Sequence, residues 1–180
     1  MPGLGRSSLY INCDWCASSF FPLLFVVFCG CGPADAPGTL CERTFQPYPD
    51  MITGRARTGM NAAYLDAMAL YAKEDYAGAR DGLKPFLHDQ RADLTPYIYL
   101  ACCYIALGEP YEAELQLDHL EQSQILQYDD QIEWYTIVCW VCSGQLDRAR
   151  VGAQAIVDGK AHTYSKEAAV LLKELESSKH

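Results

Sequence analysis

Apolar residues recur every three or four positions from Asn61 onward, and this spacing predicts amphipathic α-helices. The clearest example lies between Thr95-Pro96, which suits the start of a helix, and Gly108, which permits a turn into the next one. The pattern therefore predicts an all-α domain over residues 61–177, built from consecutive pairs of helices. The side chains expected to fill the interior of the second pair are Tyr97, Leu100, Ala101, Tyr104, Ala113, Leu117 and Leu120.

The helix pairs repeat with a fixed period. Ala79 and Ala113 are 34 residues apart, and Ala149 follows 36 residues after Ala113, so the loop before the third pair carries two extra residues. A 34-residue period with small residues at the helix crossing resembles the tetratricopeptide repeat (TPR) family. An ordinary helical bundle is the alternative. Later interior positions are expected at Ile137, Trp140 and Ile156 in the third pair, and at Ala169, Leu172 and Leu175 in a final helix.

The resemblance implies a right-handed α-solenoid of about three TPR-like helical hairpins, followed by a C-terminal capping helix. In TPR proteins the first helix of each hairpin lines a concave groove that binds other proteins. On this chain the groove positions are aromatic and aliphatic, which suits an apolar peptide or helix. Alternatively, the Phe45–Tyr48 segment covers the groove from within. The partner-binding residues implied by the resemblance are Tyr64, Met68, Tyr71, Ile98, Cys102, Ile105, Gln131, Trp134, Val138 and Val141.

Residues 1–30 are expected to form a signal peptide or membrane anchor. The apolar run from Phe20 to Cys29 is short for a membrane span, which needs about 20 residues, and has the length of a signal-peptide core. Its ending, Cys29-Gly-Cys31, resembles a bacterial lipobox, which implies lipidation of Cys31. The alternative is a single uncleaved membrane helix. Both readings predict a protein tethered to the bacterial cell envelope, with its repeat domain in the periplasm.

Residues 31–60 read as a linker rich in Pro and Gly. Pro47 and Pro49 prevent a helix around them. The stretch Thr44–Pro49 is similar to a Phe-x-Pro-Tyr element that precedes the repeats in some envelope-anchored bacterial TPR proteins.

The charge of the chain narrows the class of partner. Twenty-three acidic residues against 14 basic ones give a net charge of −9, which repels nucleic acid. The sequence lacks the motifs typical of catalytic or phosphate-binding sites, so we expect no enzyme activity, cofactor or metal site. The cysteines inside helical patterns, Cys102, Cys103, Cys139 and Cys142, are interpreted as small core residues, although a disulfide in an oxidising compartment stays possible.

These observations predict a non-catalytic, membrane-tethered adaptor that binds a protein or peptide partner. The alternative is a structural protein that forms homo-oligomers, such as a homodimer, through the same groove. A subunit accessory to an enzyme of envelope assembly would carry the same sequence features as the adaptor.

Overall fold

The computed structural model describes residues 38–88, 94–123, 126–159 and 161–177. Over these ranges the chain forms eight α-helices and two short 3₁₀ helices, with no strand, which confirms the predicted all-α class. The chain is divided after Ala34, and the fold described below is that of the second unit, Asp35–His180. No helix among the described residues is long and apolar enough to cross a membrane. The segment 1–30 and Cys31 lie outside the described residues.

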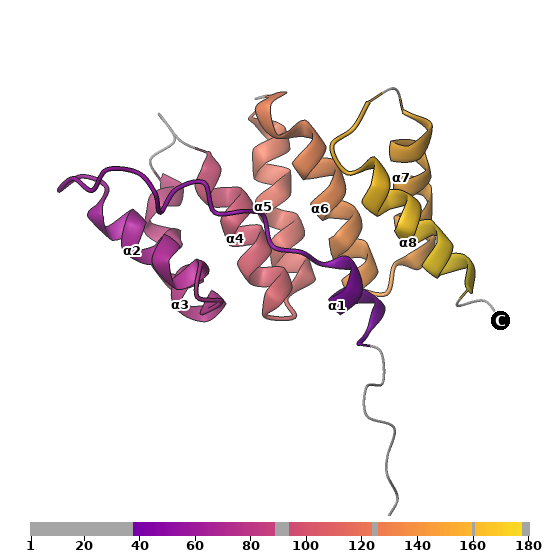
Figure 1. Ribbon diagram of the computed structural model, residues 1–180, viewed down its shortest axis with the longest axis horizontal. Helices are drawn as coiled ribbons and strands as arrows, with labels where there is room; N and C mark the ends of the chain where they lie inside the picture. The colour runs from indigo at the N-terminus through magenta and orange to yellow at the C-terminus, as the bar shows by residue number, and fades with distance from the viewer. Residues whose placement is uncertain (1–37, 89–93, 124–125, 160, 178–180) are drawn as a thin grey trace, which may run out of the picture. The chain divides into compact units, whose positions relative to one another are not determined.

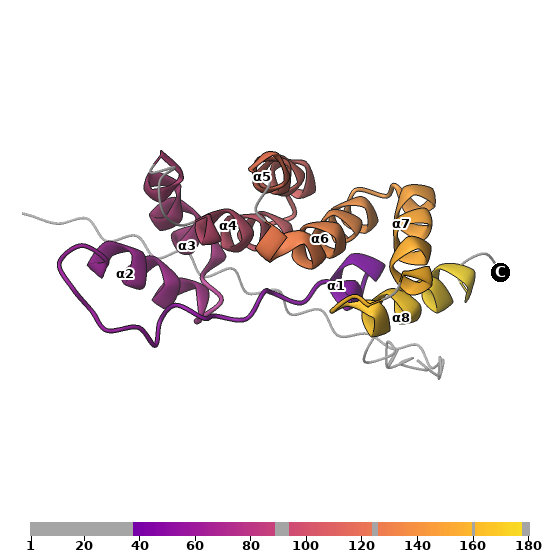
Figure 2. The ribbon, with the colours of Figure 1, turned by 90° about the horizontal axis from the view of Figure 1, so that it is seen from above.

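Three consecutive helix pairs make up most of the second unit (Figures 1 and 2). Within each pair the two helices pack on each other, and the second helix of one pair packs on the first helix of the next. The final helix, α8 (Ser165–Ser177), packs on α7, and the 3₁₀ helices η1 (Lys84–His88) and η2 (Leu126–Tyr128) follow α3 and precede α6. The pairs are α2 (Ala62–Tyr71) with α3 (Tyr76–Leu83), α4 (Thr95–Ala106) with α5 (Pro110–Gln122), and α6 (Asp129–Cys142) with α7 (Leu146–Asp158).

The turn inside each pair has the same backbone geometry. One residue in each turn has a positive φ: Glu74 (62°), Gly108 (75°) and Gly144 (76°). The N–H of the next residue donates to a carbonyl near the end of the preceding helix, at 2.8–3.0 Å in all three turns. This pattern is a common C-terminal cap of α-helices, in which the helix ends at a residue with left-handed backbone conformation. Such a position favours glycine. The three positions are spaced by 34 and 36 residues, which is the spacing of the alanines identified in the sequence.

Small residues bring the paired helices into close contact. Ala79, Ala113 and Ala149 are all completely buried. A Cβ atom added to Gly82 would lie 2.8 Å from Ala67 Cβ, and one added to Gly152 would lie 2.8 Å from Ile137 Cγ1. Glycine in a helix interior costs about 1 kcal/mol relative to alanine, but at these two positions it allows the helices to approach.

Two burial predictions are corrected by the structure. Helix α8 buries Ala168, Leu171 and Leu175, whereas the sequence pattern indicated Ala169, Leu172 and Leu175. Its apolar face is decided by contacts with α7 and with α1 (Leu40–Thr44), which the pattern of one helix does not contain. In α6, Trp140 was expected in the interior but is partly exposed. Trp134, on the same helix, is only 3% exposed.

The segment 45–52, which we call the strap, is part of the folded unit. It follows α1, which begins with a capping box in which Thr39 and Glu42 each bond the backbone of the other. Figure 1 shows the strap, in indigo, running from α1 back toward α2. Phe45 and Tyr48 are half-buried and Ile52 is buried, so this proline-containing stretch contributes to the core.

Candidate functional site

Three tyrosine hydroxyls hold the strap against the first helix of each pair. Each hydroxyl donates a hydrogen bond to a strap carbonyl, so these bonds fix the strap through its backbone. Because the three donors come from α6, α4 and α2, one short segment bridges all three helix pairs. The bonds run from Tyr135 to Gln46 O at 2.9 Å, from Tyr99 to Pro49 O at 3.1 Å and from Tyr71 to Tyr48 O at 2.8 Å.

The strap also donates hydrogen bonds to the helices beneath it. The N–H of Tyr48 donates to Cys102 Sγ at 3.4 Å, and the N–H of Met51 donates to Tyr99 Oη at 2.9 Å. The ring of Tyr48 packs against that of Tyr99, with the centroids 5.6 Å apart. Burial raises the pKa of the Cys102 thiol to about 11 and that of Cys103 to about 12. Both thiols are therefore protonated at neutral pH, which makes them poor nucleophiles.

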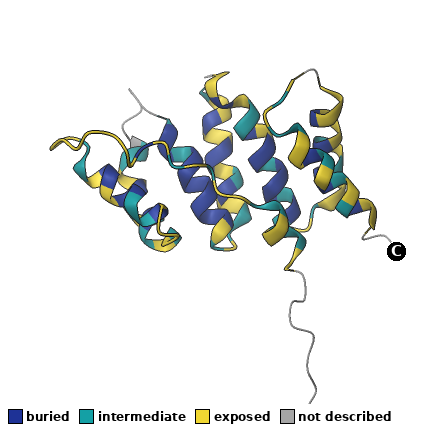
Figure 3. Cartoon of the chain, viewed as in Figure 1, coloured by how far each residue is buried: buried dark blue, intermediate teal, exposed yellow. Residues whose placement is uncertain are grey.

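The residues predicted to line a partner-binding groove lie on α2, α4 and α6, and most of them are covered in this structure. Figure 3 shows α4 and α6 buried along much of their length. Nine of the ten side chains are buried, and Gln131 is partly exposed. Two of the nine, Tyr71 and Cys102, form hydrogen bonds with the backbone of the strap. The nine buried residues are Tyr64, Met68, Tyr71, Ile98, Cys102, Ile105, Trp134, Val138 and Val141.

A disulfide fixes α1, the helix that precedes the strap. Cys41 in α1 is bonded to Cys142 at the end of α6, across 101 residues of sequence, with the Cα atoms 4.7 Å apart. The Arg43 guanidinium forms an ion pair with Glu174 of α8 at 2.9 Å, which holds α1 on a second helix. The interpretation of Cys142 as a small core residue is therefore wrong. Cys102, Cys103 and Cys139 are buried, as predicted, and are free thiols.

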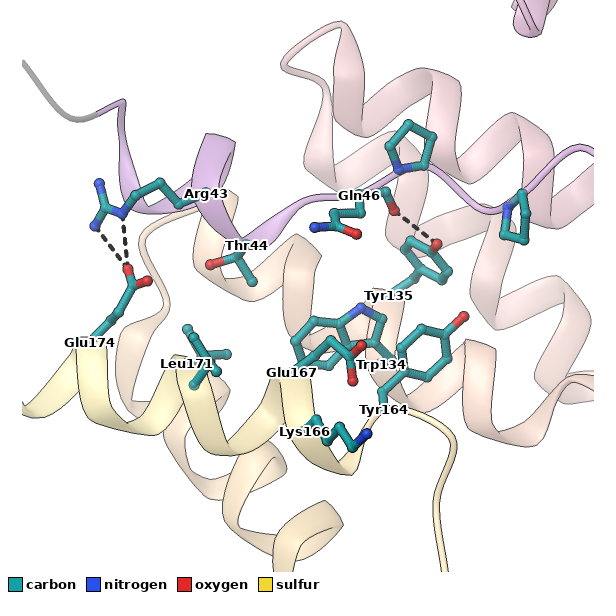
Figure 4. A pocket seen from close by; sticks show the side chains of 13 residues that line it. Arg43, Thr44, Gln46, Trp134, Tyr135, Tyr164, Lys166, Glu167, Leu171 and Glu174 are labelled. Atoms are coloured by element: carbon teal, nitrogen blue, oxygen red, sulfur yellow. Dashed lines mark hydrogen bonds and ion pairs between the residues drawn. The ribbon is translucent and has the colours of Figure 1, made fainter. Parts of the chain in front are cut away.

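We call the surface of α2, α4 and α6 on which the strap lies the inner face. One part of it stays accessible, as a pocket of about 330 Å³ between the strap, α6 and α8 (Figure 4). The indole of Trp134 stacks on the ring of Tyr164, with the centroids 5.6 Å apart and the planes 9° from parallel. Pro47 and Pro49 of the strap form part of the wall, and Val170 of α8, which is 54% exposed, lies at the rim. The pocket therefore offers flat aromatic and aliphatic surfaces.

The charged side chains of the pocket balance one another. Arg43 is paired with Glu174, and Lys166 and Glu167 supply one further charge of each sign. A neutral pocket with aromatic walls suits an apolar segment better than a charged ligand. Of the pocket's residues, only Trp134 was named from the sequence as partner-binding, and Gln46 and Pro47 belong to the Phe45–Tyr48 segment named there as a possible cover. Tyr164 was missed because it lies in the loop before α8, where helical periodicity gives no signal.

No group of His, Cys, Asp and Glu side chains that could hold a metal ion occurs among the described residues. Comparisons of the chain with models of known protein families, with characterised proteins and with solved structures found no match.

Proposed function

We propose that this protein is a non-catalytic protein–protein interaction adaptor of the TPR type. Three helix pairs with turns of the same geometry, spaced by 34 and 36 residues, support a right-handed α-solenoid. The completely buried alanines at equivalent positions support the same assignment. In such an architecture the binding surface is built from helices that stack in sequence, so the partner contacts several pairs at once.

The adaptor is tethered at a bacterial envelope membrane with its repeats in the periplasm, through a lipid on Cys31 or through a helix in residues 1–30. The disulfide between Cys41 and Cys142 supports this location, because structural disulfides form and persist in oxidising compartments such as the periplasm. The tether raises the local concentration of the binding surface, so that a weak affinity is sufficient for capture.

The binding site of the adaptor is the pocket between the strap, α6 and α8. The observation that carries this proposal is the stacked pair of Trp134 and Tyr164 beneath an open, electrically balanced pocket. Aromatic side chains dominate the binding energy of protein interfaces, because they bury a large area with little loss of conformational freedom. An apolar peptide or helix of the partner inserts a side chain against these rings, and Val170 contacts it at the rim.

The strap preorganises this binding site before a partner binds. With residues 45–52 bound to three helices, the prolines at the pocket wall are held in place before any partner arrives. A preformed wall lowers the ordering cost of binding.

Site-specific photo-crosslinking in native membranes tests the proposal. A benzophenone amino acid replaces Val170 at the pocket rim or, as the control, Leu126, which is 80% exposed on η2. We expect a discrete adduct with another protein from position 170 and none from position 126. The substitution Val170→Glu, introduced beside a crosslinker at Lys166, should remove that adduct because it places a charge at the apolar rim.

Two outcomes would contradict the adaptor. An adduct containing only two copies of this chain would instead favour the homo-oligomer. Adducts of equal yield from both positions, or from neither, would show that the pocket does not select a partner.

A further inference from the structure

A second groove, of about 440 Å³, lies between the outer helices α5 and α7, with α6 as its floor. We call it the outer groove. Figure 2 shows α5 on the side of α6 that faces away from the strap, with α7 beside α6. The outer groove and the pocket at Trp134 therefore use different faces of α6 and can be occupied independently.

The floor of the outer groove is apolar. Ile132 and Ile137 of α6 and Ile156 of α7 line it. Gly152 is also part of the lining, and its missing side chain lets the α7 backbone lie directly against Ile137. Any larger residue at position 152 would push the two helices apart.

The rim of the outer groove is acidic. Glu114, Asp118 and Glu121 line it from α5, at helical spacing that places them on one side of that helix. Glu133 of α6 adds a fourth carboxylate, which lies 3.4 Å from His162 Nε2. Among the described residues, neither Asp118 nor Glu121 forms an ion pair with a basic side chain.

The only arginine or lysine among the lining residues is Arg148, and it is already engaged. Its guanidinium lies 4.4 Å from the centroid of the Trp140 ring and 3.9 Å from a carboxylate oxygen of Glu114. Glu114 also accepts a hydrogen bond from Trp140 Nε1 at 2.9 Å. These three side chains form a fixed end wall, and the carboxylates beyond them remain available to an external cation.

We propose that the outer groove binds a basic amphipathic segment of a partner protein. Apolar side chains of the segment rest on the isoleucine floor, while its lysine or arginine side chains pair with Asp118, Glu121 and Glu133. Charge complementarity of this kind steers association and selects the partner, and exposed charges contribute less to the affinity itself.

The chain itself is a poor source of such a segment. Residues 1–37 contain a single basic residue, Arg6, and two acidic ones, so they cannot neutralise this rim. A second copy of the chain would bring another net charge of −9 against the same surface. The groove therefore selects a foreign, positively charged protein segment.

The test measures the fluorescence anisotropy of labelled synthetic peptides added to the full chain in a neutral detergent. The first peptide is about four helical turns long, with leucines at i, i+3, i+4 and i+7 and lysines at most other positions. The second replaces lysine with glutamate, and the third keeps lysine but replaces leucine with serine. Empty micelles give the background. We expect saturable binding of the first peptide alone, weakening as salt is added.

Matched charge-removing variants locate the binding. Asp118→Asn with Glu121→Gln should weaken binding of the first peptide roughly 2- to 30-fold, the range expected for two exposed ion pairs. Glu112→Gln with Glu176→Gln removes the same charge from exposed positions outside the groove and should leave the affinity unchanged. Val170→Glu, at the other pocket, should also leave it unchanged, which separates this proposal from the adaptor pocket.

The proposal is overturned if both double variants weaken binding equally, because the attraction would then be to net charge alone. It is also overturned if the serine peptide binds as tightly as the leucine peptide, or if no peptide binds.

Discussion

The backbone N–H of Tyr48 donates a hydrogen bond to the sulfur of Cys102 at 3.4 Å, although the two residues are 54 positions apart. This contact places the strap directly over the first helix of the second pair. Cys102 occupies a position that the TPR resemblance assigns to an open groove, yet it is completely buried. The strap therefore covers part of the surface for which the resemblance implies partner binding.

The hydroxyl of Tyr99 should be important for stability because it serves two strap residues. It donates to Pro49 O and accepts from Met51 N–H. Tyr99→Phe leaves both backbone groups without this partner, and we expect a loss of about 1–3 kcal/mol in the free energy of unfolding. Tyr111→Phe, at a side chain that is 66% exposed, is the control and should change little. Urea unfolding followed by circular dichroism measures both, and equal values would show that the hydroxyl of Tyr99 makes no special contribution.

Reduction of the disulfide between Cys41 and Cys142 should lower stability substantially. In the chain-entropy account, a crosslink across about 100 residues stabilises the fold by about 4–5 kcal/mol. We expect a clear fall in Tm when a phosphine reductant is added to the wild-type chain. The double variant Cys41→Ser with Cys142→Ser should already have the lower Tm and should not respond to reductant. An unchanged Tm in a wild-type sample whose mass confirms reduction would contradict this prediction.

Gly82 should not tolerate even an alanine. In most helix interiors Gly→Ala gains about 1 kcal/mol, but here the new methyl would lie 2.8 Å from Ala67 Cβ. Overpacking of this kind costs about 1–3 kcal/mol, so we expect a net loss of stability. Gly59→Ala, where a Cβ has no neighbour within 4 Å, is the control. A higher midpoint of thermal unfolding for Gly82→Ala would mean that α2 and α3 are less closely packed than described.

Glu74 is a position where stability can be gained. Its φ of 62° is left-handed, whereas the equivalent positions in the next two turns are Gly108 and Gly144. Glu74→Gly should raise the free energy of unfolding by about 0.5–1 kcal/mol, because glycine adopts this conformation without steric cost. Glu74→Ala keeps the unfavourable Cβ and should give no such gain. Chemical denaturation of the two variants decides the point, and a gain in both would indicate that the glutamate side chain, and not the backbone, is responsible.

The helix pairs were predictable from the sequence because local chemistry dictates them. Glycines at 108 and 144 suit left-handed turns, and the alanines at 79, 113 and 149 mark the helix crossings. Each of these signals lies within a few residues of the feature that it controls, so one sequence is sufficient to place it.

The features that close the inner face were less predictable, because they depend on contacts between distant parts of the chain. The strap has no helical or strand-like periodicity, and its backbone is bonded by tyrosines up to 89 residues away. Coverage by Phe45–Tyr48 was recognised only as an alternative. The pairing of Cys41 with Cys142 could not be deduced, since spacing alone does not fix disulfide connectivity. The partial exposure of Trp140 could not be deduced, because Arg148, which lies over its ring, comes from another element.

Hydrogen–deuterium exchange of the strap amides in the native full chain tests the central claim most directly. If the strap covers the inner face, the N–H groups of Tyr48 and Met51 are hydrogen-bonded and should exchange slowly, as should the amides of α4. The exposed residues Gly54, Ala56, Arg57 and Gly59, directly beyond the strap, should exchange much faster and provide an internal reference. Exchange of the strap at the rate of these four residues, with α4 still protected, would contradict the account and show that the inner face is open to a partner.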